Sequence, residues 1–299
     1  MRNLKVHFAG LEGASFGVAV KNAGVKYGLA TAYFSVKSRM KNGIGSSNAH
    51  IDSYLAKLSS MYKHMIMDSG VFTLMYGAEA GKKDKRTIYK WFDCLVDFES
   101  KYCQGMSCVE VDCQKILSPE VAWELRREMR RQMPNHDIMN VWHLEDGELG
   151  LRRIAEFSNY IGIAVLEHKA AFGKRYNETV LNAVMKVNQI NPNLRIHLLG
   201  CTGKKLLRAC KYHCYSSDST SYKVDLRYGP PSETSFQGKK YKYDKDFIMN
   251  AGMSCFDEYC SCLKSPAQKT SSTIELLGRI YATALLHKLH YTGLCGDQE

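Results

Sequence analysis

Short runs of apolar, β-favouring residues recur along the chain and alternate with longer segments whose apolar residues repeat every three to four positions. The short runs predict strands at residues 4–10, 27–34, 64–70, 106–112, 137–143, 160–165, 195–200 and 213–219. The repeats predict amphipathic helices, most clearly at residues 49–62, 86–102, 119–133, 149–158 and 177–190. Strands that alternate with helices are typical of a parallel sheet covered on both faces.

The eight predicted strands match the number in a closed (β/α)8 TIM barrel, which we expect to occupy residues 1–222. Residues 223–299 then form a C-terminal extension that packs on the barrel. An open doubly wound sheet is the structural alternative. Its nucleotide-binding form has no support, because no G-x-G-x-x-G follows the first strand and no G-x-x-x-x-G-K-[ST] occurs.

Side chains with acid–base chemistry end several of the predicted strands. They are Asp68, Asp112, His143 and Asp218. Catalytic groups of a barrel lie at the C-terminal ends of its strands, so carboxylates from three strands that are not neighbours would meet at one mouth. Each acid alone could instead cap a helix or form a salt bridge. Together they predict a site that either binds a divalent cation or holds and attacks a polar heterocycle.

The charge of the chain changes the expected partner. The 299 residues carry a formal net charge of +11, which suits a polyanion such as a nucleic acid. Basic residues that could follow a nucleic-acid backbone lie on predicted loops or loop ends, at Lys82, Lys83, Lys85, Arg86, Lys204, Lys205, Lys239 and Lys240. The cluster RREMRRQ at 126–132 falls on a predicted helix, and we expect it to be a solvent-exposed face.

Eleven cysteines are present, while no apolar run is long enough for a membrane span or for the core of a signal peptide. We therefore expect a cytoplasmic protein whose cysteines are mostly reduced core residues. Cys255, Cys260 and Cys262 differ from the others, because they crowd into eight residues.

The strand-end residues also carry a family resemblance. MDSGVF at 67–72 resembles the DSGGFQ of tRNA-guanine transglycosylases, and GIAV at 162–165 resembles their GLAVGE strand. VEVD at 109–112 lies where that family has its second conserved-motif Asp. The segment HLLGCTGKKLLRACKYHCYSSDS at 197–219 parallels the family segment that carries the nucleophile. The likeness keeps its order over roughly residues 64–290.

Departures from the tRNA enzymes indicate another branch of that superfamily. DSGVF lacks the second Gly, and VWH at 141–143 occupies the strand that supplies a base-reading Gln in the tRNA enzymes. With SSDSTSY and the opening FAGLEG, these features resemble the small DNA 7-deazaguanine transglycosylases of phages and some bacteria. The resemblance implies an enzyme that replaces guanine in DNA by a 7-deazaguanine such as 7-cyano-7-deazaguanine, in the host cytoplasm if a phage encodes it. Action on tRNA and a noncatalytic, nucleic-acid-binding accessory barrel are the alternatives.

The resemblance also assigns catalytic roles. Asp218 is expected to attack C1′ and to hold the sugar as a covalent ester, with the hydroxyl groups of Ser217, Ser219 and Thr220 orienting it. Asp68 is expected to protonate the leaving guanine and later to act as the base for the incoming heterocycle.

Further residues are expected to bind the base. Asp112 would accept hydrogen bonds from N1–H and the exocyclic amine of guanine, an edge that 7-deazaguanines share. Ser69, Gly70 and Gly162 would line the same pocket with backbone groups. His143 has two interpretations, a hydrogen bond to the base or phosphate and a structural role at the strand end.

The C-terminal cysteines resemble a metal site of the same family. The tRNA enzymes bind zinc through C-x-C-x-x-C and a His about one helix later, whereas this chain has C-x₄-C-x-C. Three thiolates and one imidazole suit a structural Zn²⁺. We expect the ligands Cys255, Cys260, Cys262 and His287, with His290 as the substitute for His287. Three reduced cysteines without a metal are the alternative, and a homodimer or a helper protein is compatible with the sequence.

Overall fold

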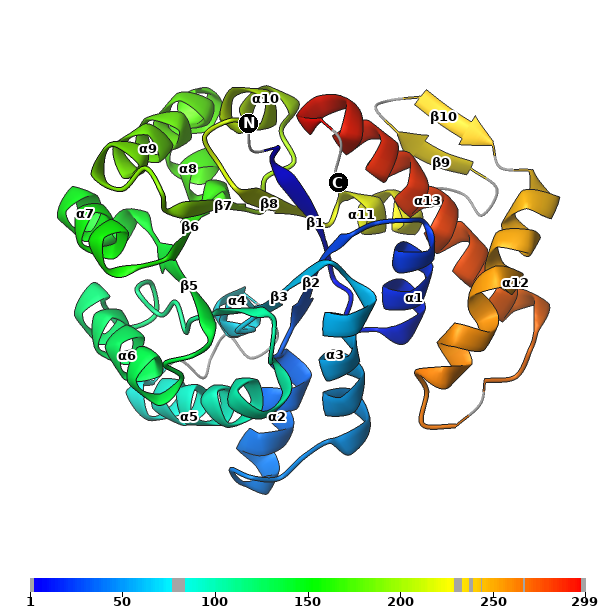
Figure 1. The fold of residues 1–299 in the computed structure, drawn as a ribbon, viewed down its shortest axis with the longest axis horizontal. Helices are drawn as coiled ribbons and strands as arrows, with labels where there is room; N and C mark the ends of the chain where they lie inside the picture. Colours follow the sequence, from blue (N-terminus) through cyan, green and yellow to red (C-terminus); the bar gives the residue numbers. More distant parts are fainter. Residues whose placement is uncertain are drawn as a thin grey trace.

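The computed structural model describes residues 3–76, 84–228, 233–236, 239–242, 244–265 and 267–296, and for 74–76, 228, 233–236 and 239–242 it describes the backbone only. Within these residues, eight parallel strands form a closed barrel, because β1 pairs with both β2 and β8 (Figure 1). The strands are β1 Lys5–Ala9, β2 Tyr27–Thr31, β3 His64–Asp68, β4 Ser107–Val109, β5 Asp137–Trp142, β6 Tyr160–Ala164, β7 Arg195–Leu199 and β8 Ser216–Ser219. The predicted (β/α)8 barrel is confirmed, and the open doubly wound sheet is excluded.

Helices follow the strands and form the outer layer of the barrel (Figure 1). They are α1 Ala14–Asn22, α2 Tyr33–Asn42, α3 Ala49–Met61, α4 Val71–Tyr76, α5 Lys85–Tyr102, α6 Pro119–Gln132, α7 Gly147–Phe157, α8 Val165–Phe172, α9 Tyr176–Ile190, α10 Lys204–Cys210, α11 Ser221–Tyr228, α12 Lys245–Ser261 and α13 Ser271–Cys295. Single turns of 3₁₀ helix are η1 Leu144–Asp146 and η2 Gly173–Arg175, and β9 Glu233–Phe236 pairs antiparallel with β10 Lys239–Lys242. None of the helices in the described part of the chain is both long and apolar enough to cross a bilayer.

Side chains of each strand alternate between the barrel interior and the helical layer. In β7, Ile196 and Leu198 belong to the large apolar core beneath the helices, whereas Leu199 packs with the small core inside the barrel. That inner core contains Ile66, Val109 and Met139 from three other strands. The barrel interior is therefore filled by side chains, which include the buried imidazoles of His7 and His197 as well as apolar residues.

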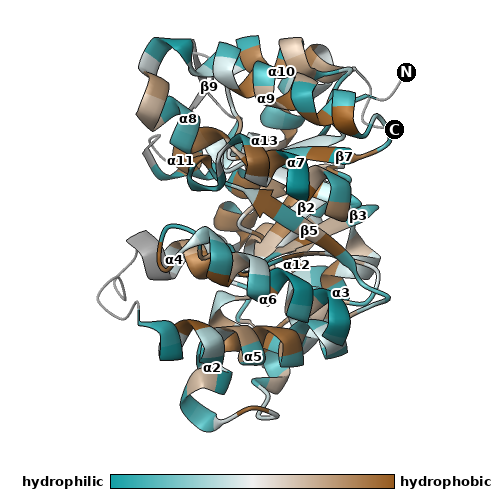
Figure 2. Ribbon diagram, turned by 90° about the vertical axis from the view of Figure 1, so that its left-hand side faces the viewer, coloured by the Kyte–Doolittle hydropathy of each residue, from teal (hydrophilic) through white to brown (hydrophobic). Residues whose placement is uncertain are grey.

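The C-terminal ends of the strands face the side of the molecule that carries α4, α8 and α11. These helices directly follow β3, β6 and β8 in the chain. Figure 2 places them on one side of the molecule and both chain termini on the other. Groups at the ends of these strands consequently share one mouth of the barrel, as expected for this fold.

The segment after α11 completes the outer layer of the barrel. Helix α13 packs against α1, α10 and α11, and it fills the gap in the ring between α10 and α1 (Figure 1). Its Tyr291 stacks edge-on against Phe8 of β1 and donates a hydrogen bond from its hydroxyl to Ser219 Oγ at 2.8 Å. The C-terminal segment is thus joined to the first and last strands through buried contacts.

Helices α12 and α13 touch backbone to backbone. A Cβ atom at Gly252 would lie 1.9 Å from the carbonyl oxygen of Ile274, and one at Gly278 would lie 1.9 Å from that of Ile248. Only glycine permits such an approach, because any side chain would overlap the partner's backbone. The two glycines therefore fix how this helix pair packs.

One residue of the basic cluster at 126–132 differs from the prediction of a solvent-exposed face. Arg126 in α6 is buried rather than solvent-exposed, and its guanidinium forms a two-pronged pair with Glu110, with NH2 to Oε1 at 2.6 Å. Glu110 also accepts hydrogen bonds from Asn140 Nδ2 and from the backbone N–H of Val141. A helix that packs on strands buries one face, and the apolar pattern of α6 did not reveal that this face includes an arginine.

Candidate active site

Asp68 ends β3 at the C-terminal mouth, and its carboxyl group is only partly exposed. Its Oδ2 accepts the backbone N–H of Gly70 at 3.2 Å, and Thr31, its neighbour in register on β2, contributes a side-chain hydrogen bond. Burial, followed by the charges of Asp112 and Asp218, raises the pKa of Asp68 to about 7. A carboxyl group of this kind can both give and take a proton near neutral pH.

The turn after Asp68 has a shape that only glycine allows. Gly70 has φ +76°, and a Cβ atom there would lie 2.9 Å from Cα of Tyr33. Ser69 is buried, its carbonyl accepts Trp91 Nε1–H at 3.1 Å, and its hydroxyl lies 3.5 Å from Asp112 Oδ1. The tight turn thus directs the hydroxyl of Ser69 toward a second acid.

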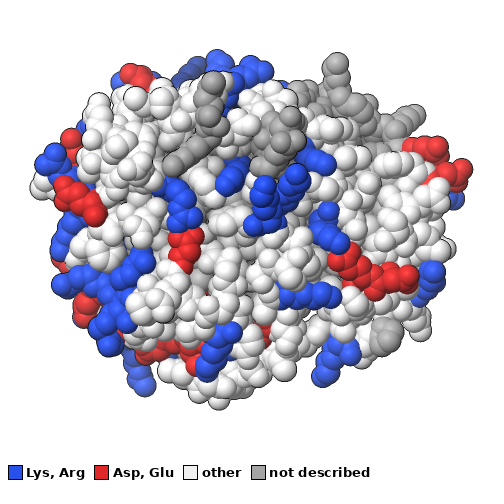
Figure 3. All heavy atoms as spheres, viewed as in Figure 1, with Lys and Arg blue, Asp and Glu red and all other residues white. Residues whose placement is uncertain are grey.

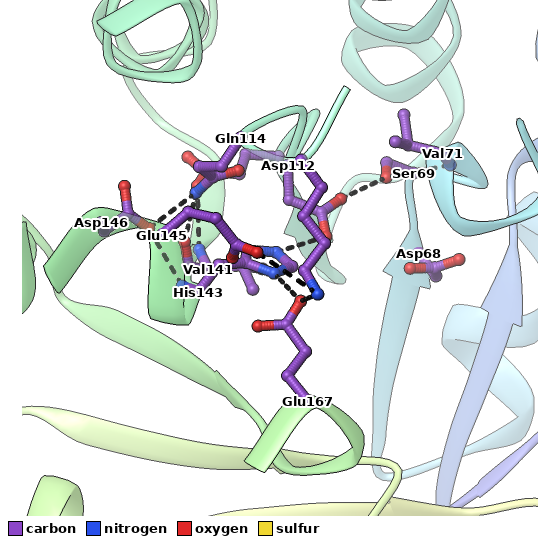
Figure 4. Close-up of polar contacts among 12 residues, drawn as sticks. Asp68, Ser69, Val71, Asp112, Gln114, Val141, His143, Glu145, Asp146 and Glu167 are labelled. Carbon is purple, nitrogen blue, oxygen red and sulfur yellow. Dashed lines mark hydrogen bonds and ion pairs between the residues drawn. The ribbon is translucent and has the colours of Figure 1, made fainter. Parts of the chain in front are cut away.

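Asp112 and His143 form a pair at the ends of β4 and β5. Asp112 lies three residues beyond the last residue of β4, and His143 directly follows β5. His143 Nε2 is 3.0 Å from Asp112 Oδ2, and His143 Nδ1 is 2.5 Å from Glu167 Oε1 at the start of α8 (Figure 4). Burial disfavours the charged ring, but the hydrogen bonds with Asp112 and Glu167 outweigh it and raise the pKa of His143 to about 10. His143 is therefore an imidazolium that donates to two carboxylates.

Glu167 belongs to a wider cluster of charges. Lys115 Nζ lies 2.9 Å from Glu167 Oε1 and 3.5 Å from Glu145 Oε1. Ligand atoms of His143, Glu145 and Glu167 also lie within 4.8 Å of one another, and they are the only such group of three among the described residues. Because Lys115 and His143 already place two cations among these carboxylates, the cluster balances its charge within the chain.

Asp218 projects from β8 into the same mouth, with its side chain 13% exposed. Its Oδ1 accepts the backbone N–H of Gly200 at 2.7 Å and lies 3.1 Å from His197 Nε2. No described residue makes a hydrogen bond to its Oδ2. One carboxylate oxygen is thus held by two donors, while the other is available to a bound molecule.

Two of the three hydroxyl groups expected to orient Asp218, those of Ser217 and Ser219, do not do so. Ser219 Oγ accepts from Tyr291 and from the backbone N–H of Ser221, on the face of β8 toward α13. Ser217 Oγ is buried without a hydrogen-bond partner in the described part of the chain. Neighbouring residues of a strand point to opposite faces, so neither serine can reach the carboxylate between them.

The three acids do converge, although their strands are arranged differently from the expectation. Asp68 and Asp112 come from β3 and β4, which are hydrogen-bonded neighbours, whereas Asp218 comes from β8. The expectation of three nonadjacent strands is therefore wrong for this pair. Figure 4 shows Asp68 apart from the Asp112–His143–Glu167 group, without a hydrogen bond to it.

The remaining predicted base-pocket residue, Gly162, lies in the middle of β6. A Cβ atom there would lie 3.1 Å from Leu199 Cδ1 and 3.2 Å from Met139 Sδ. Its lack of a side chain makes room for these two apolar neighbours in the inner core.

The structure describes only some of the basic residues that we expect to follow a nucleic-acid backbone. Lys85 and Arg86 begin α5, Lys204 and Lys205 begin α10, and all four side chains are exposed. Lys82 and Lys83 lie outside the described residues, as do the side chains of Lys239 and Lys240 in β10. Lys and Arg are spread over the face shown in Figure 3, with acidic side chains among them, rather than gathered in one patch.

The residues expected to bind zinc do not fit a tetrahedral site. Cys255 and Cys260 both lie in the continuous helix α12, where a separation of five residues turns side chains about 140° apart. Cys262 Sγ lies 3.4 Å from Lys57 Nζ, and His287 Nε2 lies 2.8 Å from Asp225 Oδ2. These four side chains form no group with metal-ligand separations.

Several site residues carry no motif that identifies them from the sequence. Glu167 contacts His143 from the start of α8, and Lys115, which follows β4, contacts Glu167, so only the barrel brings the three residues together. His197 offers one signal, because it is a polar residue between the apolar Ile196 and Leu198 of β7.

The fold and the site together define the class of the protein as a (β/α)8 barrel with an acidic cluster at its C-terminal mouth, where barrel enzymes carry their active sites. Neither protein-family models nor curated proteins match this chain. The chemistry of the side chains at this mouth is therefore the main evidence for function.

Proposed function

We propose that this protein is a pentosyltransferase that exchanges guanine in DNA for a 7-deazaguanine derivative through a covalent bond between Asp218 and C1′. The observation that supports the proposal most is the meeting of Asp68, Asp112 and Asp218 at one mouth, where burial, followed by the charges of Asp112 and Asp218, raises the pKa of Asp68 to about 7. Base exchange at one sugar carbon needs a nucleophile, a proton donor and a group that recognises the purine.

Asp218 supplies the nucleophile. Its Oδ1 is held by Gly200 N and His197 Nε2, so Oδ2 can approach C1′. The Oδ2–C1′ bond forms as the C1′–N9 bond breaks, and the electron pair of that bond passes to the purine. Attack of the incoming base on the resulting ester reverses these changes, so configuration at C1′ is retained.

Asp68 supplies the proton that the departing guanine needs. With a pKa of about 7, a large fraction of its carboxyl groups is protonated at neutral pH. After guanine leaves, the ionised Asp68 accepts a proton from the incoming 7-deazaguanine. One residue thus serves both half-reactions.

Asp112 recognises the base. Each carboxylate oxygen accepts more than one hydrogen bond, so the contacts with Ser69 and His143 leave capacity for N1–H and the exocyclic amine of guanine. The His143 imidazolium fixes the carboxylate in position, supported by Glu167. This favours the interpretation of His143 as a site residue.

The nucleic acid must present its base outside a duplex stack, because the acids lie within the mouth of the barrel. The exposed Lys85, Arg86, Lys204 and Lys205 begin helices beside this mouth and suit contact with phosphates. The resemblance of residues 141–143 and 216–222 to the small DNA enzymes favours DNA over tRNA.

The test is an exchange assay with radiolabelled guanine, then with unlabelled 7-cyano-7-deazaguanine as the competitor, on single-stranded DNA, duplex DNA and tRNA. We expect label in DNA, and a protein–DNA adduct that resists denaturant when the incoming base is withheld. Label in tRNA alone would replace DNA by tRNA in the proposal. Binding to nucleic acid without label in either substrate would favour the noncatalytic accessory barrel.

A further inference from the structure

His197 lies inside the barrel, below the mouth. The side chain projects from β7 and is fully buried, while its strand neighbours Ile196 and Leu198 face the helical layer. A buried imidazole requires partners for both ring nitrogens. The identity of these partners shows what the residue does.

Both nitrogens contact the neighbouring strand β8, and Nδ1 also lies 3.4 Å from the hydroxyl oxygen of Tyr160 in β6. Nε2 lies 3.1 Å from Asp218 Oδ1, and Nδ1 lies 2.7 Å from Ser216 Oγ. Ser216 and Asp218 are two residues apart, so both point into the barrel, and His197 bridges them. The chain of contacts continues to Tyr160 of β6, whose hydroxyl oxygen lies 2.5 Å from Ser216 Oγ.

The donors and acceptors of this chain can be assigned by elimination. A carboxylate only accepts hydrogen bonds, so the proton that faces Asp218 is on Nε2 of His197. In a neutral ring Nδ1 then accepts, and the hydroxyl of Ser216 donates to it. Burial raises the pKa of Tyr160, which keeps its phenol protonated and able to donate to Ser216 Oγ.

We propose that His197 is a positioning residue for Asp218, and that Tyr160 and Ser216 hold it in the tautomer that carries its proton on Nε2. The catalytic meaning of this arrangement rests on the proposed function. His197 and the N–H of Gly200 hold Oδ1, so the carboxylate cannot rotate, and Oδ2 is the oxygen that bonds to C1′. His197 transfers no proton during this step.

Nuclear magnetic resonance of the ¹⁵N-histidine-labelled, full-length protein tests the tautomer without any assay of activity. We expect the long-range proton–nitrogen spectrum of His197 to show a protonated Nε2 and an unprotonated Nδ1. Tyr160→Phe and Ser216→Ala should each introduce signal from the other tautomer. A wild-type His197 that is protonated on Nδ1, or on both nitrogens, would overturn the proposal whether or not the protein exchanges bases.

Kinetic measurements test the positioning role. The amide of glutamine can reach the place of Nε2, whereas that of asparagine matches Nδ1. We therefore expect His197→Gln to keep roughly a tenth of the wild-type kcat and His197→Asn to keep a hundredth or less, with KM for DNA changed less than threefold in both. Equal kcat in the two variants and the wild type would sink the positioning role.

Tyr160→Phe serves as the control for folding, because it removes one hydroxyl group and keeps the ring. This variant should retain the wild-type circular dichroism spectrum and lose kcat two- to tenfold at constant KM. If wild-type protein exchanges no base on DNA or tRNA, the proposed function fails, and the tautomer spectrum still decides whether His197 is held as proposed.

Discussion

Two aspartates inside the barrel, Asp137 at its N-terminal end and Asp68 at its C-terminal end, have opposite environments. Asp137 begins β5 and is paired with the guanidinium of Arg195, with Ser107 Oγ at 2.5 Å as a further donor. Burial alone would raise its pKa, but the bonds from Arg195 and Ser107 outweigh burial and lower it. Among the described residues no cation pairs with Asp68 in this way, and the pKa of Asp68 is raised to about 7.

The two ends of the barrel differ in what surrounds their carboxylates. At the N-terminal end, Arg195 also stacks over Tyr160, and Lys5 lies 3.7 Å from the ring centre of Tyr215, so each cation there has a partner. At the C-terminal end, Asp68 faces two further acids, and their repulsion opposes its ionisation. Asp137 thus joins strands at one end through its pair with Arg195, whereas Asp68 at the other end is held beside two further acids.

The largest expected effect comes from matched substitutions of the acids at the two ends. Asp218→Asn should lower base exchange by about 10⁴-fold or more, because an amide cannot form the sugar ester. Asp137→Asn should leave exchange within about threefold of wild type. Initial rates with labelled guanine measure both variants, and a fully active Asp218→Asn protein would remove the nucleophile from the mechanism.

Asp68→Asn is expected to slow exchange by about 10²- to 10⁴-fold, the usual contribution of a general acid. In the wild-type enzyme, kcat should fall as pH rises above about 7, because Asp68 then loses the proton it gives to guanine. Exchange rates measured from pH 5.5 to 9 in a buffer of constant ionic strength test this decrease of kcat. A flat profile through pH 7 would contradict the assignment of Asp68.

Arg195→Met should lower the free energy of unfolding by about 1–2 kcal/mol at pH 7, since it leaves Asp137 without its cation in a partly exposed position. The folded-state pKa of Asp137 is lowered, so the stabilisation is present above its unfolded value near 3.8 and is lost as pH falls through the folded value. Urea unfolding at pH 7 and pH 3.5 should therefore show a smaller difference between variant and wild type at the lower pH. An equal loss at both pH values would mean that packing, not charge, sets the effect.

Asp68→Asn should have the opposite effect on stability and raise the free energy of unfolding by about 1 kcal/mol at pH 8. The folded-state pKa of Asp68 is raised, so the folded wild type loses stability as pH rises from about 4 to above 7. Asparagine mimics the protonated acid, and the gain should vanish near pH 4. Thermal unfolding across this pH range measures the gain in stability. If Asp68→Asn is less stable than the wild type at pH 8, the surroundings of Asp68 do not destabilise its ionised form.

The smallest effect is expected from metal removal. Because the candidate zinc ligands do not converge, while Gly252 and Gly278 let α12 and α13 pack directly, a chelator should change the melting temperature by less than about 1 °C. Elemental analysis of the purified protein is the matching measurement. One equivalent of zinc that is lost together with several degrees of stability would restore the predicted Cys255, Cys260, Cys262 and His287 site.

The apolar runs of the sequence predicted all eight strands, and the closed barrel confirms them. Strand-end position also identified Asp68, Asp112, His143 and Asp218, because the ends of parallel strands must meet on one face whatever the details of packing. The same reasoning assigned Ser217 and Ser219 to Asp218, and that was wrong because it used distance along the chain and ignored the alternation of a strand.

What the sequence alone determined is the kind of scaffold and the chemical groups at its mouth, since both follow from local periodicity and from where strands end. Only the tertiary structure decided which groups touch. Asp112 and Glu167 fix the charge on His143, His197 holds Asp218, and Arg195 neutralises Asp137, although each pair is separated by many residues in the chain. Charge states depend on burial and on neighbours brought close by folding, and no local pattern of residues encodes these distances.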